Sequence, residues 1–195
     1  MNKIAILDLG LNNIKSIYNL CSKFYSTYIF SKPNELKKDT NILILPGNGN
    51  FGKGMEVLNN RNLSNFLMNI SSEIKIIGIC LGMQIFMSES DESPNIKGLS
   101  LISGKVIKIK ENDNYNNPLL GWYNVKFENK EFKKFEGSFF FNNNFIVQPS
   151  NKEFIYGNLD DFPIFTISKN IYGIQFHPEL SRGLGSNFLK YIIER

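Results

Sequence analysis

The chain has 195 residues, a formal net charge of +4 and two cysteines. This length fits one domain over residues 1–195 with a full core, and two cysteines provide neither a disulfide framework nor a metal site. The lysines and arginines are scattered, which argues against a nucleic-acid binder, and no apolar segment approaches the length that spans a membrane. The apolar run near the N-terminus is too short for a signal peptide, so we expect a reduced, cytoplasmic protein.

The first half of the sequence alternates segments that favour strands with segments that favour helices. Short apolar runs predict strands at residues 4–9, 28–30, 41–45 and 74–79. Helices are expected at residues 14–24 with Asn12 or Asn13 as the N-cap, at residues 55–70, and directly after Cys80. Such alternation indicates an α/β fold in which helices cover a mostly parallel sheet.

The second half consists mostly of short strands separated by Asn, Gly and Pro. Polar loops are expected at residues 91–95 and 110–118. We predict strands at residues 105–109, 121–127, 138–147, 154–158, 163–168 and 171–175, and a terminal helix at residues 186–194. These strands predict an antiparallel addition to the sheet of the first half.

Residues 78–82, GICLG, follow an apolar run and precede a helix-compatible segment. Glycines on both sides of Cys80 leave room for the tight strand-to-helix turn that presents a nucleophile above a sheet. At such a turn the first N–H groups of the helix favour a thiolate. A free cysteine is commonly a small buried apolar residue, and we expect that role for Cys21, which lies on an apolar helix face. For Cys80 the flanking glycines favour the nucleophile.

A cysteine nucleophile needs a proton acceptor, and His177 is the only histidine in the chain. Side chains two residues apart in extended backbone face the same side, so Glu179 can hold the His177 ring by a hydrogen bond. Pro178 lacks a backbone donor and suits the end of a strand, where α/β folds build their sites. A structural histidine is the alternative interpretation, but the pattern favours a triad of Cys80, His177 and Glu179.

Residues 46–55, PGNGNFGKGM, follow an apolar strand and lead into a helix. They match neither the P-loop nor the dinucleotide-binding fingerprint. Beside a thiolate, such flexible backbone can turn the N–H of Asn48 or Gly49 toward a developing oxyanion, with the N–H of Leu81 as the second donor.

These motifs resemble those of the class I glutamine amidotransferases, in residues 78–84, GICLGMQ, and in the His-Pro-Glu motif at residues 177–179. The resemblance spans essentially the whole chain and implies a three-layer fold with a central sheet between helices. It implies that Cys80 attacks the side-chain amide of L-glutamine, that His177 moves the proton, and that water hydrolyses the resulting thioester after ammonia leaves. It implies no metal or cofactor. The positions that match the family's glutamine pocket are Gly49, Gln84, Glu92 and Asn143.

Within that family, residues 46–55, 98–106, 121–122 and 173–179 resemble the glutaminase subunits of imidazole glycerol phosphate synthases, which belong to histidine biosynthesis. This resemblance implies a heterodimer in which ammonia passes into a separate (β/α)8-barrel subunit. The chain departs from the usual pattern of these subunits at residues 119–123 and 139–144, at Asn12, and at Leu180, where a basic residue is usual.

The departures fall mostly on the rim of the glutamine pocket and on the surface that would face the barrel, and they leave other functions open. The principal alternative is a paralogous subunit that supplies ammonia to a barrel-like partner for amidation of a nucleotide-linked surface sugar. A regulatory subunit without catalysis is a second alternative. A cysteine peptidase or thioesterase with the same triad is a third, because one arrangement of side chains serves several reactions.

Overall fold

The structure is a computed structural model that describes residues 2–11, 14–111 and 115–195. Its strands are β1 (Lys3–Leu7), β2 (Ser26–Phe30), β3 (Ile42–Leu45), β4 (Lys75–Ile79), β5 (Glu89–Ser90), β6 (Gly104–Lys108), β7 (Leu119–Phe127), β8 (Gly137–Asn143), β9 (Phe145–Pro149), β10 (Ile155–Leu159), β11 (Phe162–Ser168) and β12 (Ile171–Ile174). Its α-helices are α1 (Lys15–Ser22), α2 (Phe51–Asn60), α3 (Leu63–Ile70), α4 (Leu81–Ile85) and α5 (Arg182–Glu194). Short 3₁₀ turns are η1 (Pro33–Glu35), η2 (Lys133–Phe135), η3 (Lys152–Phe154) and η4 (Pro178–Leu180).

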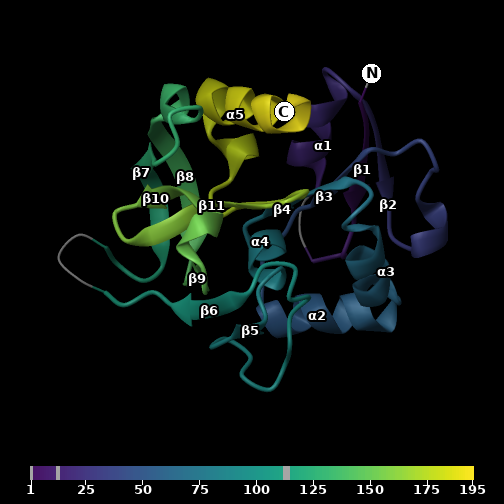
Figure 1. Cartoon of the computed structure of the whole chain (residues 1–195), viewed down its shortest axis with the longest axis horizontal. Coiled ribbons are helices and arrows are strands. Elements are labelled where there is room, and N and C mark those ends of the chain that lie inside the picture. The colour runs from purple at the N-terminus through teal and green to yellow at the C-terminus, as the bar shows by residue number, and fades with distance from the viewer. Residues whose placement is uncertain (1, 12–13, 112–114) are drawn as a thin grey trace.

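A nine-stranded sheet runs through the molecule in the order β2-β1-β3-β4-β12-β11-β10-β7-β8 (Figure 1). Its first five strands are parallel to one another. From β12 onward each strand is antiparallel to its neighbour. A smaller sheet contains β5, β6 and β9. The predicted α/β class, with antiparallel strands added in the second half of the chain, is confirmed.

The large sheet buries apolar side chains on both of its faces. Along β1, Ile4 and Ile6 belong to the core that α1 and α5 cover, whereas Ala5 and Leu7 belong to the core that α2, α3 and α4 cover (Figure 1). All four side chains are fully buried. A continuous apolar run is what a parallel strand between two helical layers requires. The helices therefore form the outer layers of a three-layer fold.

Cys21 is a residue of α1, and its buried side chain packs into the core beneath that helix, as predicted. Burial, with a smaller contribution from the nearby charge of Glu179, raises the pKa of the Cys21 thiol to about 12. This thiol therefore stays protonated and packs as an apolar group.

Two predicted elements are wrong, because each is divided in the structure. The helix predicted at residues 55–70 breaks at Asn62, whose left-handed backbone (φ +57°) separates α2 from α3; asparagine tolerates this conformation better than most residues. The strand predicted at residues 138–147 ends in the large sheet at Asn143 and resumes in the small sheet at Phe145. Between them, the carbonyl of Asn144 accepts a hydrogen bond from the Ile109 N–H at 3.0 Å.

Smaller differences concern the ends of elements and one missed strand. Helix α5 begins at Arg182, four residues before its predicted start, and the two-residue strand β5 falls in a segment predicted as loop or unassigned. The predicted N-caps Asn12 and Asn13 lie outside the described residues, as do residues 112–114 of the predicted loop 110–118. Among the described residues, no helix has the length and apolar character needed to cross a membrane.

Close backbone contacts fix the turn between β4 and α4. A methyl group on Gly82 would overlap the carbonyl oxygen of Leu45 in the neighbouring strand β3. A methyl group on Gly78 would lie 2.6 Å from the carbonyl carbon of Gly82. Both atoms are backbone and cannot move aside, so the prediction that these glycines make room for the turn is confirmed.

We therefore expect Gly82→Ala to lower the free energy of unfolding by about 3 kcal/mol or more, because the new methyl group overlaps backbone. The matched control is Gly183→Ala in α5, where a methyl group would meet nothing within 4 Å. The control should change stability by less than about 1 kcal/mol. Urea denaturation of both variants is the measurement, and equal stabilities would contradict this account of the turn.

Candidate active site

Two parallel strands bring Cys80 and His177 to the same edge of the sheet. β4 pairs with β12 so that Ile79 lies opposite Ile174. Cys80 comes directly after the first strand, and His177 comes three residues after the second. Because neighbouring parallel strands end at the same edge, the two residues come close enough to interact although they are 97 positions apart in the sequence.

The backbone at Cys80 is strained and firmly held. Its φ and ψ are +54° and −109°, a combination that non-glycine residues rarely adopt. Its N–H donates a hydrogen bond to the carbonyl of Ile174 at 2.7 Å, which attaches the turn to β12. The residue is only 4% exposed. A strained cysteine between a strand and a helix is the geometry of a nucleophile elbow.

His177 pairs with Glu179 as predicted, although Pro178–Leu180 form the 3₁₀ turn η4 and not the extended backbone that the prediction assumed. The His177 Nδ1 lies 2.9 Å from Oε1 of Glu179, and both side chains are largely buried. Burial lowers the pKa of the imidazole, but its interactions with Cys80 and Glu179 outweigh burial and raise the pKa to about 10. The other ring nitrogen, Nε2, is buried and makes no well-aligned hydrogen bond. With Nδ1 engaged by the carboxylate, Nε2 is the ring atom available to exchange a proton with Cys80.

Asn143, predicted in the substrate pocket, lies directly on the sulfur. Its Nδ2 donates a hydrogen bond to Sγ of Cys80 at 3.2 Å, and the side chain is buried. The amide oxygen of Asn143 is also buried and has no partner. A buried amide oxygen without a partner is costly, so it is suited to accept a donor from a bound molecule.

The other predicted pocket residues have structural partners here. Gln84 is buried in α4, and its Nε2 donates a hydrogen bond to the carbonyl of Phe145 at 2.9 Å. Oε2 of Glu92 accepts a hydrogen bond from the N–H of Phe51 at 2.6 Å, at the first residue of α2. These contacts fix the segment before β9 and the start of α2. The roles of Gln84 and Glu92 in binding glutamine stay predictions.

The predicted oxyanion donors are not all free in this conformation. The N–H of Leu81 donates a hydrogen bond to the carbonyl of Gly47 at 3.4 Å. Gly49 has a φ of +140°, which side-chain-bearing residues rarely adopt, and a methyl group there would meet nothing within 4 Å. Its glycine is therefore required by backbone conformation and not by crowding. The roles of Asn48, Gly49 and Leu81 as oxyanion donors stay predictions.

A small cavity of about 190 Å³ opens beside the imidazole. The loop after β3 forms one wall and the turn that follows His177 forms the other. Its lining residues are Ser16, Ile17, Pro46, Gly47, Asn48, His177, Glu179 and Leu180. The predicted oxyanion loop and the His–Glu pair thus face one crevice.

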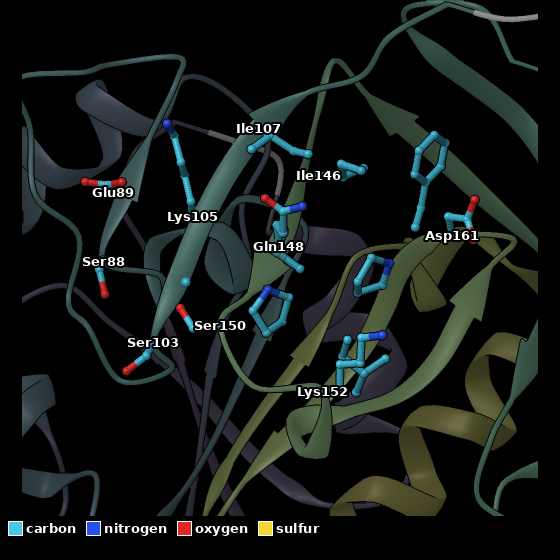
Figure 2. Close-up of a pocket in the computed structure, with 16 residues that line it drawn as sticks. Ser88, Glu89, Ser103, Lys105, Ile107, Ile146, Gln148, Ser150, Lys152 and Asp161 are labelled. Atoms are coloured by element: carbon cyan, nitrogen blue, oxygen red, sulfur yellow. The ribbon is translucent and has the colours of Figure 1, made fainter.

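A larger cavity, of about 750 Å³, lies elsewhere and is drawn in Figure 2. Figure 2 shows Ser88 and Lys105 on the side of the small sheet, with Lys152 and Asp161 on the opposite side. None of the residues predicted for the active site lines it. Cavity size therefore does not decide between the two crevices, and the chemistry of Cys80 and His177 favours the smaller one as the candidate site.

Sequence reasoning missed one residue of this region, Ser181. It is 1% exposed, and its hydroxyl contacts the backbone of His177. A serine directly before a predicted helix is typical of an N-cap, so the sequence pattern points away from the site. Among the described residues, no group of three or more His, Cys, Asp or Glu side chains is arranged to hold a metal ion.

Comparison with known proteins identifies the family. The model of the class I glutamine amidotransferase family matches residues 6–192. The imidazole glycerol phosphate synthase subunit HisH of Pyrococcus furiosus is 36% identical, over 97% of this chain and 97% of that protein. The subunit of the same name from Methanopyrus kandleri is 32% identical, over 98% of this chain and 97% of that protein.

Solved structures support the same fold. A crystal structure described as a glutamine amidotransferase covers 98% of this chain and 97% of its own, with a TM-score of 0.80 at 15% identity. A chain of PurLQS from Thermotoga maritima covers 99% of this chain and 98% of its own, with a TM-score of 0.75 at 14% identity. The family model, and the relatives that match along nearly their whole length, show that the chain belongs to the class I glutamine amidotransferases.

Proposed function

We propose that this protein is the glutaminase subunit of an imidazole glycerol phosphate synthase, formed by a single domain over residues 1–195. It hydrolyses L-glutamine to glutamate and ammonia in the cytoplasm. The ammonia passes to a (β/α)8-barrel subunit of the heterodimer, which makes imidazole glycerol phosphate and AICAR in histidine biosynthesis. The observation that carries the proposal is the meeting of Cys80 with the His177–Glu179 pair at one sheet edge, in a chain whose relatives bear that synthase's name over nearly full length.

The chemistry follows from the arrangement of the triad. At neutral pH the raised pKa of His177 keeps the ring an imidazolium, whose Nε2 holds the proton given up by Cys80, and Glu179 stabilises this charge through Nδ1. The sulfur attacks the carbonyl carbon of the glutamine side chain, and the tetrahedral intermediate collapses when His177 returns the proton to the departing nitrogen. Ammonia leaves and a glutamyl thioester remains. His177 then accepts a proton from water, which attacks the thioester and releases glutamate and the Cys80 sulfur.

The hydrogen bond between Leu81 and Gly47 sets the resting state. The tetrahedral intermediate needs N–H donors at its oxyanion, and losing one donor typically costs about 3–4 kcal/mol. The Leu81 N–H is engaged by the Gly47 carbonyl, so the backbone at residues 47–49 has to turn before that donor reaches the substrate. A barrel partner that turns this segment would couple ammonia release to the presence of its acceptor.

Exposed apolar side chains near the active site provide a surface for that partner. Leu120 and Trp122 lie on the same face of β7 and are 57% and 43% exposed. The Trp122 ring contacts that of Phe140, whose centroid is 6.5 Å from the imidazole of His177. Leu180, 46% exposed, lines the crevice next to His177. Large exposed apolar groups around a site are typical of protein interfaces.

The surface-sugar paralogue is the second candidate function. Exposed Leu180, where the synthase subunits usually carry a basic residue, is the observation that favours it. Both candidates share the glutaminase chemistry and differ in the barrel and its acceptor. Reconstitution with the barrel subunit of each pathway separates them, because only the correct barrel and its acceptor should raise glutamine hydrolysis.

We expect Cys80→Ala to lower glutamine hydrolysis at least about 10³-fold, because no other group can form the thioester. Cys21→Ala is the matched control, since it removes the other buried thiol and leaves the crevice intact. The control should keep kcat within about twofold. The measurement is glutamate release with the partner barrel present. Full activity of Cys80→Ala would contradict the triad.

The protonation of His177 gives a second prediction. Because its folded pKa is raised to about 10 from an ordinary value of about 6.5, the single imidazole NMR signal of an untagged chain should titrate well above neutral pH. Folding retains a proton that the unfolded chain releases, so the free energy of unfolding should fall as pH rises from about 6.5 to about 10. Glu179→Gln should lower the titration midpoint, and a midpoint near 6.5 in the unsubstituted protein would contradict the charge pairing.

The partner surface gives a third prediction. Leu120→Asp should weaken binding of the barrel subunit at least about tenfold, because it places a charge in the centre of an apolar contact. Phe24→Asp is the matched control, since Phe24 is 48% exposed on the side of α1 that contacts Lys190 of α5. Calorimetric titration measures both affinities. Equal losses in the two variants would place the barrel elsewhere.

A further inference from the structure

A buried hydroxyl fastens the backbone of His177 to strand β8. The Ser181 Oγ donates a hydrogen bond to the carbonyl of His177 at 2.6 Å and accepts one from the N–H of Phe140 at 3.0 Å. The N–H of His177 donates to the carbonyl of Phe140 at 2.9 Å. Both backbone groups of His177 are thus tied to one residue of β8, directly on one side and through Ser181 on the other.

Ser181 does not serve the helix that it precedes. It occupies the N-cap position of α5, where a serine hydroxyl ordinarily accepts a hydrogen bond from the first turn, yet its side chain makes no such bond. The next residue, Arg182, has a φ of +54°, an uncommon value for a residue with a side chain. Helix α5 therefore begins without a side-chain cap and with a strained backbone at Arg182, while the Ser181 hydroxyl bonds to His177.

Close packing holds Ser181 in place from behind. The N–H of Gly185 donates to the Ser181 carbonyl at 3.0 Å, and a methyl group on Gly185 would lie 2.5 Å from Cβ of Ser181. The helix therefore presses directly on the serine. Because Ser181 can move neither toward α5 nor into solvent, its two hydrogen bonds have a fixed geometry.

The fastened segment contains the whole His–Glu pair. The turn η4 lies between His177 and Ser181 and carries Glu179. The N–H of Leu180 donates to the same His177 carbonyl at 3.1 Å. A shift of that carbonyl would move both the imidazole and the carboxylate relative to the sulfur on β4.

We propose that Ser181 is a positioning residue that holds His177 and Glu179 in register with Cys80. The proposal rests on the glutaminase function proposed above, but the orientation of the imidazole can be measured without any substrate. A displacement of about 1 Å in a reacting group typically costs about 10²-fold in rate, so the loss of one fastening bond should be visible in kcat.

The test compares Ser181→Ala with Ser186→Ala in the untagged chain. Ser186 lies on the same helix, is half-buried, and donates to the carbonyls of Arg182 and Gly183, so its loss leaves the contacts of His177 intact. Because His177 is the only histidine, its imidazole NMR signal is identified without assignment. Both variants are titrated by NMR, and kcat and KM for glutamine are measured with the partner barrel.

We expect Ser181→Ala to move the titration midpoint of His177 toward 6.5 by at least about one pH unit and to lower kcat about 10- to 100-fold, with KM within about threefold. Ser186→Ala should leave all three unchanged. An unchanged His177 titration in Ser181→Ala would overturn the proposal whatever happens to activity. If Ser181→Ala does not fold, Ser181→Cys, which keeps the shape with a weaker donor, serves the same test. If the His177 midpoint shifts in Ser181→Ala but the unsubstituted protein does not hydrolyse glutamine, the positioning role is supported and the glutaminase function is refuted.

Discussion

The parallel pairing of β4 with β12 is the constraint on which the site depends. These strands come from distant parts of the chain, and their register sets Ile79 opposite Ile174, so their ends coincide. The hydrogen bond from the Cys80 N–H to the Ile174 carbonyl then joins the two ends directly. The strain at Cys80 is tolerable because glycines beside it allow backbone contact with β3, and because both strands are buried between two helical layers.

The candidate site combines a charged pair, His177 and Glu179, with a predicted oxyanion region whose Leu81 donor is already engaged. The His177–Glu179 contact favours an imidazolium in a largely buried environment, where its interaction partners outweigh the cost of burial. The Leu81 N–H, by contrast, is satisfied by the Gly47 carbonyl. One part of the machinery is thus rigid, and the other consists of backbone whose glycines permit a second conformation. Under the proposed mechanism, the nucleophile is in place at rest and turnover depends on a change in this short loop.

Local patterns in the sequence predicted the elements that local forces determine. The apolar runs, the glycines at the elbow and the spacing of His177 and Glu179 correspond to strands, a tight turn and a paired imidazole. The break at Asn62 and the division at Asn144 were missed, although each lies in a short polar run, residues 59–62 and residues 142–144. Apolar residues resume directly after each run, and packing against different neighbours separates the halves. Ser181 was missed because one of its two partners, Phe140, comes from β8, about forty residues away in the sequence, and its position before a helix has an ordinary local explanation.

The division of the predicted strand at Asn144 has a consequence for how the molecule can vary. Asn143, whose amide contacts the sulfur, is the last residue of β8 in the large sheet, and after Asn144 the chain enters β9 of the small sheet. The candidate site therefore lies where the chain passes between two separately hydrogen-bonded sheets. Substitutions in the small sheet that displace Asn143 would change the surroundings of the Cys80 thiol, while every residue that contacts the thiol keeps its identity.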